Sequence, residues 1–146
     1  MVHVTRQFTV RADQASVVDY LKDFSHATEW DPGTVSCTRL DSGPVQVGSR
    51  WHNVSKLVVV KAELEYELVE LRDNGVVFVG TNEGSRSVDT IDVLPAEDGV
   101  RVTYDAHVTL KGTAKYAEPL LFLVFQKLAR DTVRDLTRAL ERLPRA

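Results

Sequence analysis

Residues 58–71 carry the pattern that most limits what this chain can fold into. One side of the stretch is almost entirely apolar, with Val58, Val60, Ala62, Leu64, Tyr66 and Leu68. The other side is charged, with Lys61, Glu63, Glu65 and Glu67. Successive side chains of a strand point to opposite faces, so this alternation predicts an antiparallel sheet with one dry face and one wet face. Residues 99–111 repeat it, with Val102, Tyr104, Ala106, Val108 and Leu110 on the dry side.

A sheet of this kind needs a second layer over its dry face, and the end of the chain supplies one. Residues 117–143 have apolar side chains at helical spacing, namely Leu121, Phe125, Leu128, Leu136, Leu140 and Leu143, with Thr132 among them. Pro119 suits the first turn of such a helix; if the helix began near Thr113, Pro119 would kink it. At ~1.5 Å per residue the helix is roughly 35–40 Å long, enough to cross a curved sheet.

The remaining segments complete an α+β order of one strand, two helical segments, six strands and the long helix. Besides 58–71 and 99–111, the predicted strands are 2–10, 34–40, 48–57, 75–83 and 86–95. Asp13 is a plausible N-cap for a helix that ends near Lys22 and Asp23. No turn residue separates 48–57 from 58–71, which leaves the facing of 48–57 open. Without a linker or internal repeat, residues 1–146 are predicted to form one domain.

Composition excludes several classes of function. A net charge of -3 gives no electrostatic reason to bind nucleic acid or an anionic membrane. The single cysteine, Cys37, fits a reducing cytoplasm, and residues 1–6 do not read as a signal peptide. The longest apolar run, residues 120–125, is much too short to span a bilayer. We therefore expect a soluble cytoplasmic protein without stable membrane insertion.

Several short motifs, in order along the whole chain, resemble those of the START-like (SRPBCC) helix-grip superfamily. They are Ala12-Asp13, Asp23, Trp30-Asp31-Pro32, Val47-Gly48-Ser49-Arg50-Trp51 and Gly99-Val100-Arg101-Val102-Thr103-Tyr104. The superfamily holds pollen allergens, lipid-transfer domains and polyketide cyclase/dehydrase proteins. The resemblance implies a curved sheet of about seven antiparallel strands wrapped around the C-terminal helix. It also implies an apolar cavity between them, which different members use for carriage, sensing or ring-forming catalysis.

The leading functional hypothesis is binding or carriage of a hydrophobic small molecule, whether lipid-like, aromatic or polyketide-like. The predicted lining is Trp30, Trp51, Val60, Ala62, Leu64, Tyr66, Leu68, Tyr104, Ala106, Val108, Leu121, Phe125 and Leu128. Burial of apolar area would provide the affinity, and the hydroxyls of Tyr66 and Tyr104 would orient a ligand oxygen. The alternative is that both tyrosines are plain core residues and that Trp30 anchors a short helix.

The rival hypothesis is an enzyme, a polyketide cyclase, aromatase or dehydratase. The resemblance implies a buried arginine and hydroxyl residues on the central strands for such an activity. The dry side of 58–68 offers only Tyr66, and Arg50, His52 and Ser55 are the remaining candidates. No catalytic residue is assigned, and the balance favours a binding protein.

Two other features leave alternatives open. His3, His26, His52 and His107 are scattered without metal-binding spacing, and no cofactor motif is present, so we expect no metal site and no cofactor. Residues 120–125 are apolar all round a helix. Either another element covers their outer side, or they form a pocket entrance, a homodimer contact or a lip that touches a membrane. A protein-binding adaptor would use the same stretch.

Overall fold

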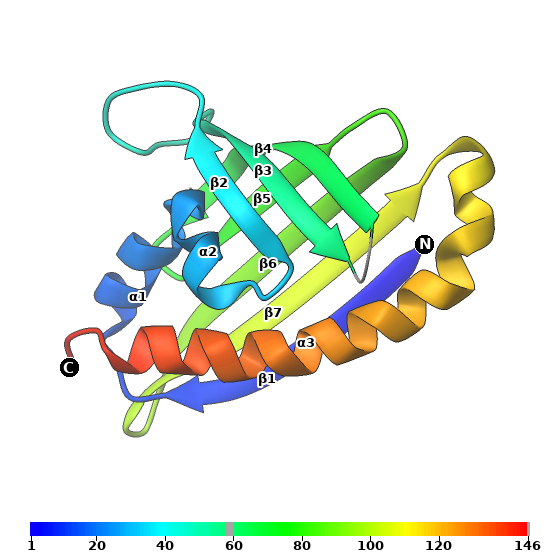
Figure 1. Cartoon of the computed structure of the whole chain (residues 1–146). Helices are drawn as coiled ribbons and strands as arrows, with labels where there is room; N and C mark the ends of the chain where they lie inside the picture. The colour runs from blue at the N-terminus through cyan, green and yellow to red at the C-terminus, as the bar shows by residue number, and fades with distance from the viewer. Residues whose placement is uncertain (58–59, 146) are drawn as a thin grey trace.

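The structure, a computed structural model, describes residues 1–57 and 60–145 and contains one antiparallel sheet (Figure 1). Its strands are β1 (Val2–Val10), β2 (Thr34–Arg39), β3 (Arg50–Leu57), β4 (Val60–Arg72), β5 (Gly75–Thr81), β6 (Ser85–Ala96) and β7 (Gly99–Leu110). They lie in the order β1-β7-β6-β5-β4-β3-β2, so β1 and β2 are the two edges. Each neighbouring pair is antiparallel, as the alternating strands predict.

The helical elements occupy the concave side of this sheet. They are α1 (Gln14–Leu21), the 3-10 turn η1 (Phe24–His26), α2 (Ala27–Trp30), a second 3-10 turn η2 (Gly112–Ala117) and α3 (Glu118–Glu141). Figure 1 shows α3 running along the open side of the curved sheet, beside β1. The predicted α+β helix-grip architecture of seven strands and a long C-terminal helix is confirmed.

The facing of the strands follows the predicted alternation where the structure describes it. Tyr66 and Leu68 of β4 are buried, whereas Glu63 and Glu65 are exposed. Val58 lies outside the described residues, as does the side chain of Val60. A register shift after Leu68 marks a bulge near the end of β4.

The facing of β3, which the sequence left open, is now clear. Trp51 and Asn53 are buried on the concave side, and Ser55 follows them in the alternation. Arg50 and His52 therefore lie on the convex side, where the Arg50 Nε is 3.5 Å from Glu67 and the His52 Nε2 is 3.2 Å from Glu63. Neither residue belongs to the interior, so of the three polar candidates on this strand only Ser55 faces the helix.

The long helix is anchored mainly at its C-terminal half. Its buried residues are Ala129, Thr132, Leu136, Ala139 and Leu140. Its end is tied to the β1–α1 connection, because the backbone N–H of Arg11 donates to Glu141 at 2.7 Å and that of Asp13 donates to the Pro144 carbonyl at 2.8 Å. Pro119 occupies the first turn, as predicted, and η2 precedes it.

Candidate functional site

The dry face of the sheet contains a group of polar side chains on β6 and β7. Ser87 and Asp89 of β6 are 7% and 5% exposed, and the Ser87 hydroxyl donates to the Asp89 carboxylate at 3.1 Å. Tyr104 of β7 points to the same side, because it lies two residues from Ala106, the cross-strand partner of Asp89. A buried carboxyl group on a largely apolar face is costly, which makes it a candidate for function.

Tyr66 reaches this group from β4 because Gly80 of β5 leaves room for its ring. Tyr66 and Gly80 are opposite each other in the register. A Cβ atom at Gly80 would lie 2.6 Å from two atoms of the Tyr66 ring. The ring therefore lies against the bare backbone of β5, and Ser87 of β6 is the cross-strand partner of Gly80 on the other side. The absence of a side chain at residue 80 thus places the phenol next to the β6 polar pair.

The environment changes the acidity of these groups. Burial, followed by the nearby Asp31, raises the pKa of Asp89 to about 7, although the hydrogen bond from Ser87 and the neighbouring Tyr104 act to lower it. Burial also raises the pKa values of Tyr66 and Tyr104 well above their usual range. Near neutral pH the two phenols are protonated donors, and Asp89 can hold or release a proton.

A second carboxyl group enters from the end of α2. Asp31 accepts hydrogen bonds from the Thr34 hydroxyl at 2.9 Å and from the backbone N–H of Gly33 at 3.1 Å. Burial raises the pKa of Asp31, and Asp135 of α3 adds to the rise. Asp31 therefore contributes negative potential to the side of the site next to α3.

Trp30 supplies an unpaired donor beside these acids. Its side chain is 1% exposed and packs edge-on against Tyr104, with ring centroids 5.9 Å apart. In the part of the chain that the structure describes, the indole N–H of Trp30 is buried and has no hydrogen-bond partner. Such a donor costs about 1–3 kcal/mol unless another group satisfies it.

Arg6 provides a positive charge on the same face at the β1 edge. It is the direct cross-strand partner of Tyr104. Its Nη2 donates to the Gln126 side chain of α3 at 2.7 Å, which links the edge strand to the helix. Arg6 lies in the predicted strand 2–10, and the sequence pattern assigned it no role.

The structure divides the predicted site residues into two groups. Those that keep some solvent contact on the concave face or on α3 are Ala62, Leu64, Tyr104, Ala106, Leu121, Phe125 and Leu128. Those that are buried are Trp30, Trp51, Tyr66, Leu68 and Val108. The partly exposed residues lie on β4, β7 and α3, and among the buried ones Trp30 packs against Tyr104.

Trp51 and Leu68 belong to the packed core. Both are fully buried. The Trp51 indole donates to Asp23 at 3.2 Å, and its ring packs edge-on against Phe24 and Phe78. The donor of Trp51 is therefore already used, unlike that of Trp30. Val60, also predicted to line the cavity, has a side chain outside the described residues.

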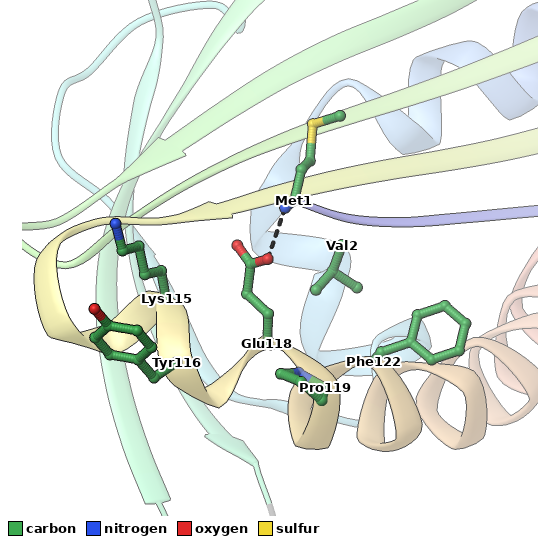
Figure 2. A pocket seen from close by; sticks show the side chains of 7 residues that line it. All are labelled: Met1, Val2, Lys115, Tyr116, Glu118, Pro119 and Phe122. Carbon is green, nitrogen blue, oxygen red and sulfur yellow. Dashed lines mark hydrogen bonds and ion pairs between the residues drawn. The ribbon is translucent and has the colours of Figure 1, made fainter.

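The start of α3 presents exposed apolar side chains. Tyr116, Leu120 and Leu123 are 78%, 67% and 66% exposed, so no other described element covers the outer side of this stretch. An adjoining hollow has a volume of about 450 Å³. Figure 2 shows the side chains that line it, among them Glu118, which pairs with the N-terminal amine of Met1 at 2.8 Å. The homodimer contact suggested for residues 120–125 stays a prediction. Among the described residues, no helix is long and apolar enough to cross a membrane.

A family model described as "Polyketide cyclase / dehydrase and lipid transport" matches residues 1–146. The chain belongs to this family. No curated protein sequence matches the chain. The match covers the whole length, and the resemblance suggested by the motifs is confirmed.

Solved structures support the same fold. The protein TTHA0849 from Thermus thermophilus is 17% identical, with a TM-score of 0.77 over 93% of this chain and 94% of that one. A START superfamily protein from Mycobacterium smegmatis is 12% identical, with a TM-score of 0.78 over 96% and 97%. The Zhui aromatase/cyclase from a Streptomyces species is 13% identical, with a TM-score of 0.76 over 96% and 93%. At these identities the similarity concerns the fold.

Proposed function

We propose that the protein binds a hydrophobic small molecule with at least one oxygen atom between the dry face of the sheet and α3. The unpaired indole N–H of Trp30, whose buried ring packs edge-on against Tyr104, is the observation that carries this proposal. A carbonyl or hydroxyl oxygen of the ligand would accept from this donor and remove its desolvation cost. Apolar residues on the partly exposed rim would cover the rest of the ligand.

The chemistry of the polar group favours a neutral oxygen over a carboxylate ligand. Asp31 and Asp89 make the interior negative whenever they are ionised. Tyr66 and Tyr104 are protonated at neutral pH and can donate hydrogen bonds, and burial moves their pKa values still further above neutral. An aromatic or polyketide-like molecule with phenol or ketone groups fits these requirements better than a fatty acid anion.

A matched pair of probes tests this proposal. We expect 2-naphthol to bind more tightly than naphthalene to the wild-type protein, since only the naphthol has an oxygen for the buried donors. Replacing the donor in Trp30→Phe should remove about 0.5–1.5 kcal/mol of that preference, the usual net value of one hydrogen bond. Naphthalene should bind both proteins similarly, because its affinity depends on buried area. Equal preference for 2-naphthol in both proteins would contradict the role of Trp30.

Native mass spectrometry of freshly purified protein is the direct test for a natural ligand. A co-purified molecule of defined mass that is lost on denaturation would support carriage. Its oxygen content would also test the requirement for a hydrogen-bond acceptor. A wild-type protein that carries no molecule and takes up neither probe would contradict the proposed binding function.

The buried carboxyl group of Asp89 supports a second candidate function, that of a cyclase or dehydratase acting on a polyketide-like chain. Such a reaction moves protons from carbon, and a buried carboxyl group with a pKa of about 7 can exchange them at neutral pH. Arg6 and the two tyrosines would then hold the ketone oxygens. In that case Asp89→Asn should reduce turnover by roughly 10²–10⁴ while the substrate still binds. Unchanged turnover in this variant would reject the catalytic role.

A further inference from the structure

The convex face of the sheet contains a cluster of metal-ligating side chains far from the interior site. His3 of β1 lies directly opposite His107 of β7, and Thr5 lies opposite Asp105. One ligand atom from each of His3, Asp105 and His107 lies within 4.8 Å of the others. The sequence was interpreted as having no partners for these histidines, and for His3 and His107 that interpretation is wrong. About 100 residues separate the two strands along the chain, so local spacing could not reveal the cluster.

Both imidazoles already point at the same carboxylate. The His3 Nε2 is 2.5 Å from the Asp105 Oδ1, and the His107 Nε2 is 2.8 Å from the Asp105 Oδ2. The two rings are stacked, with centroids 3.9 Å apart and an angle of 16° between their planes. Ligands at ~2.1 Å from a tetrahedral zinc ion are roughly 3.4 Å apart, so each of these two contacts needs to lengthen by less than about 1 Å.

The surroundings suit a cation. The side chains of His3 and His107 are 48% and 34% exposed, so an ion can reach them. Within residues 1–57 and 60–145, the ion pairs of Asp105 are with these two histidines, and no lysine or arginine neutralises it. The Thr5 hydroxyl donates to the Asp105 Oδ1 at 2.6 Å and lies 3.0 Å from the His3 Nε2. Thr5 therefore orients the carboxylate, as outer-shell partners of metal ligands commonly do.

We propose that His3, Asp105 and His107 form a Zn²⁺ site that joins the edge strand β1 to β7, with a fourth position open to water. Two imidazole nitrogens and one carboxylate oxygen are a ligand set that zinc accepts. The proposal reverses the expectation of no metal drawn from the sequence. It is independent of ligand binding in the interior, because these side chains are on the opposite face of the sheet.

Zinc titration of the tag-free protein, stripped with a chelator, tests the site. We expect one equivalent of Zn²⁺ to bind with a micromolar Kd, measured by competition with a chromophoric indicator. His3→Ala and His107→Ala should each weaken binding at least tenfold. His52→Ala is the matched control, since His52 also lies on the convex face beside a carboxylate, Glu63, but without a second histidine. Circular dichroism should show that all three variants are folded, because the substituted side chains are partly exposed.

Two results would overturn the proposal. One is wild-type binding weaker than millimolar. The other is a loss in His52→Ala as large as the loss in His3→Ala and His107→Ala, which would indicate adventitious surface binding. Thermal unfolding gives a second readout, since Zn²⁺ should raise the Tm of the wild type and of His52→Ala but not of His3→Ala.

Discussion

At the scale of single residues, the buried polar groups of the interior differ in whether each has a hydrogen-bond partner. Trp51 and Trp30 are both almost fully buried, but the indole of Trp51 donates to Asp23 and that of Trp30 has no partner among the described residues. Asp89 accepts a hydrogen bond from Ser87, yet burial still makes its ionised form unfavourable. Sequence alone cannot separate these cases, because they depend on which groups lie within hydrogen-bonding distance in the folded chain.

Asp89 should make stability depend on pH. Its folded pKa of about 7 exceeds the usual 3.8, so its neutral form stabilises the fold fully below about pH 4, and this contribution is lost as the pH rises toward 7. Asp89→Asn stays neutral throughout. We expect the difference in unfolding free energy between Asp89→Asn and the wild type to increase by about 2–3 kcal/mol, in favour of the variant, between pH 5 and pH 8.

Urea unfolding of both proteins at the two pH values measures this difference. Asp98→Asn, in the exposed turn between β6 and β7, is the control and should follow the wild-type profile. A constant offset between Asp89→Asn and the wild type would show that Asp89 does not titrate in this range.

At the scale of elements, the sequence predicted the buried face of a strand only where the two faces of that strand differ in polarity. The alternation of β4 and β7 set their facing correctly, because one side is apolar and the other charged. β6 begins with Ser85-Arg86-Ser87-Val88-Asp89-Thr90, which is polar on both sides. Nothing in that pattern marks Ser87 and Asp89 as interior residues. Their position is fixed only by the register with β5 and β7, where Gly80 faces Ser87 and Ala106 faces Asp89.

Gly80→Ala tests how β5 positions the site. The added Cβ would be 2.6 Å from the Tyr66 ring, so the ring must move or the strands must separate. We expect a loss of about 1–3 kcal/mol in unfolding free energy, typical of overpacking, and weaker binding of 2-naphthol. At Gly84 the nearest atom to an added Cβ is 3.9 Å away, so Gly84→Ala should be tolerated. Chemical denaturation of the two variants gives the comparison.

The two halves of α3 should respond differently to truncation of a leucine. Leu136 is fully buried, whereas Leu123 is 66% exposed. Leu136→Ala should therefore cost about 2–5 kcal/mol of unfolding free energy, and Leu123→Ala less than about 0.5 kcal/mol. Denaturant midpoints at constant m-value measure both. Similar losses would mean that the N-terminal half of α3 is packed as tightly as the other.

At the scale of the whole molecule, the helix and the sheet are joined most firmly at one end. Contacts of Glu141 and Pro144 with the β1–α1 connection close that end. Toward the other end the polar links are the hydrogen bond from Arg6 to Gln126 and the exposed ion pair between Met1 and Glu118, and exposed ion pairs contribute little. The overall arrangement was predictable because a one-sided sheet needs a cover, but the pattern of residues 117–143 did not show that anchoring is uneven.

Hydrogen exchange should reveal this gradient. We expect the backbone amides of residues 123–128 to exchange faster than those of residues 133–140, because the former open locally and the latter open with the core. Mass spectrometry of peptides from α3 measures the two rates under the same conditions. Equal protection along the helix would contradict the uneven anchoring.

Because the start of α3 is loosely held, we expect the residence time of a ligand to be independent of the global stability of the protein. Opening residues 118–128 exposes the partly buried rim at Leu121 and Phe125 without disturbing Leu136 or Leu140. Residence time would then follow the cost of this local opening, which is smaller than that of global unfolding. Substitutions that stabilise the core around Leu136 would raise the melting temperature and leave the rate of ligand exchange nearly unchanged.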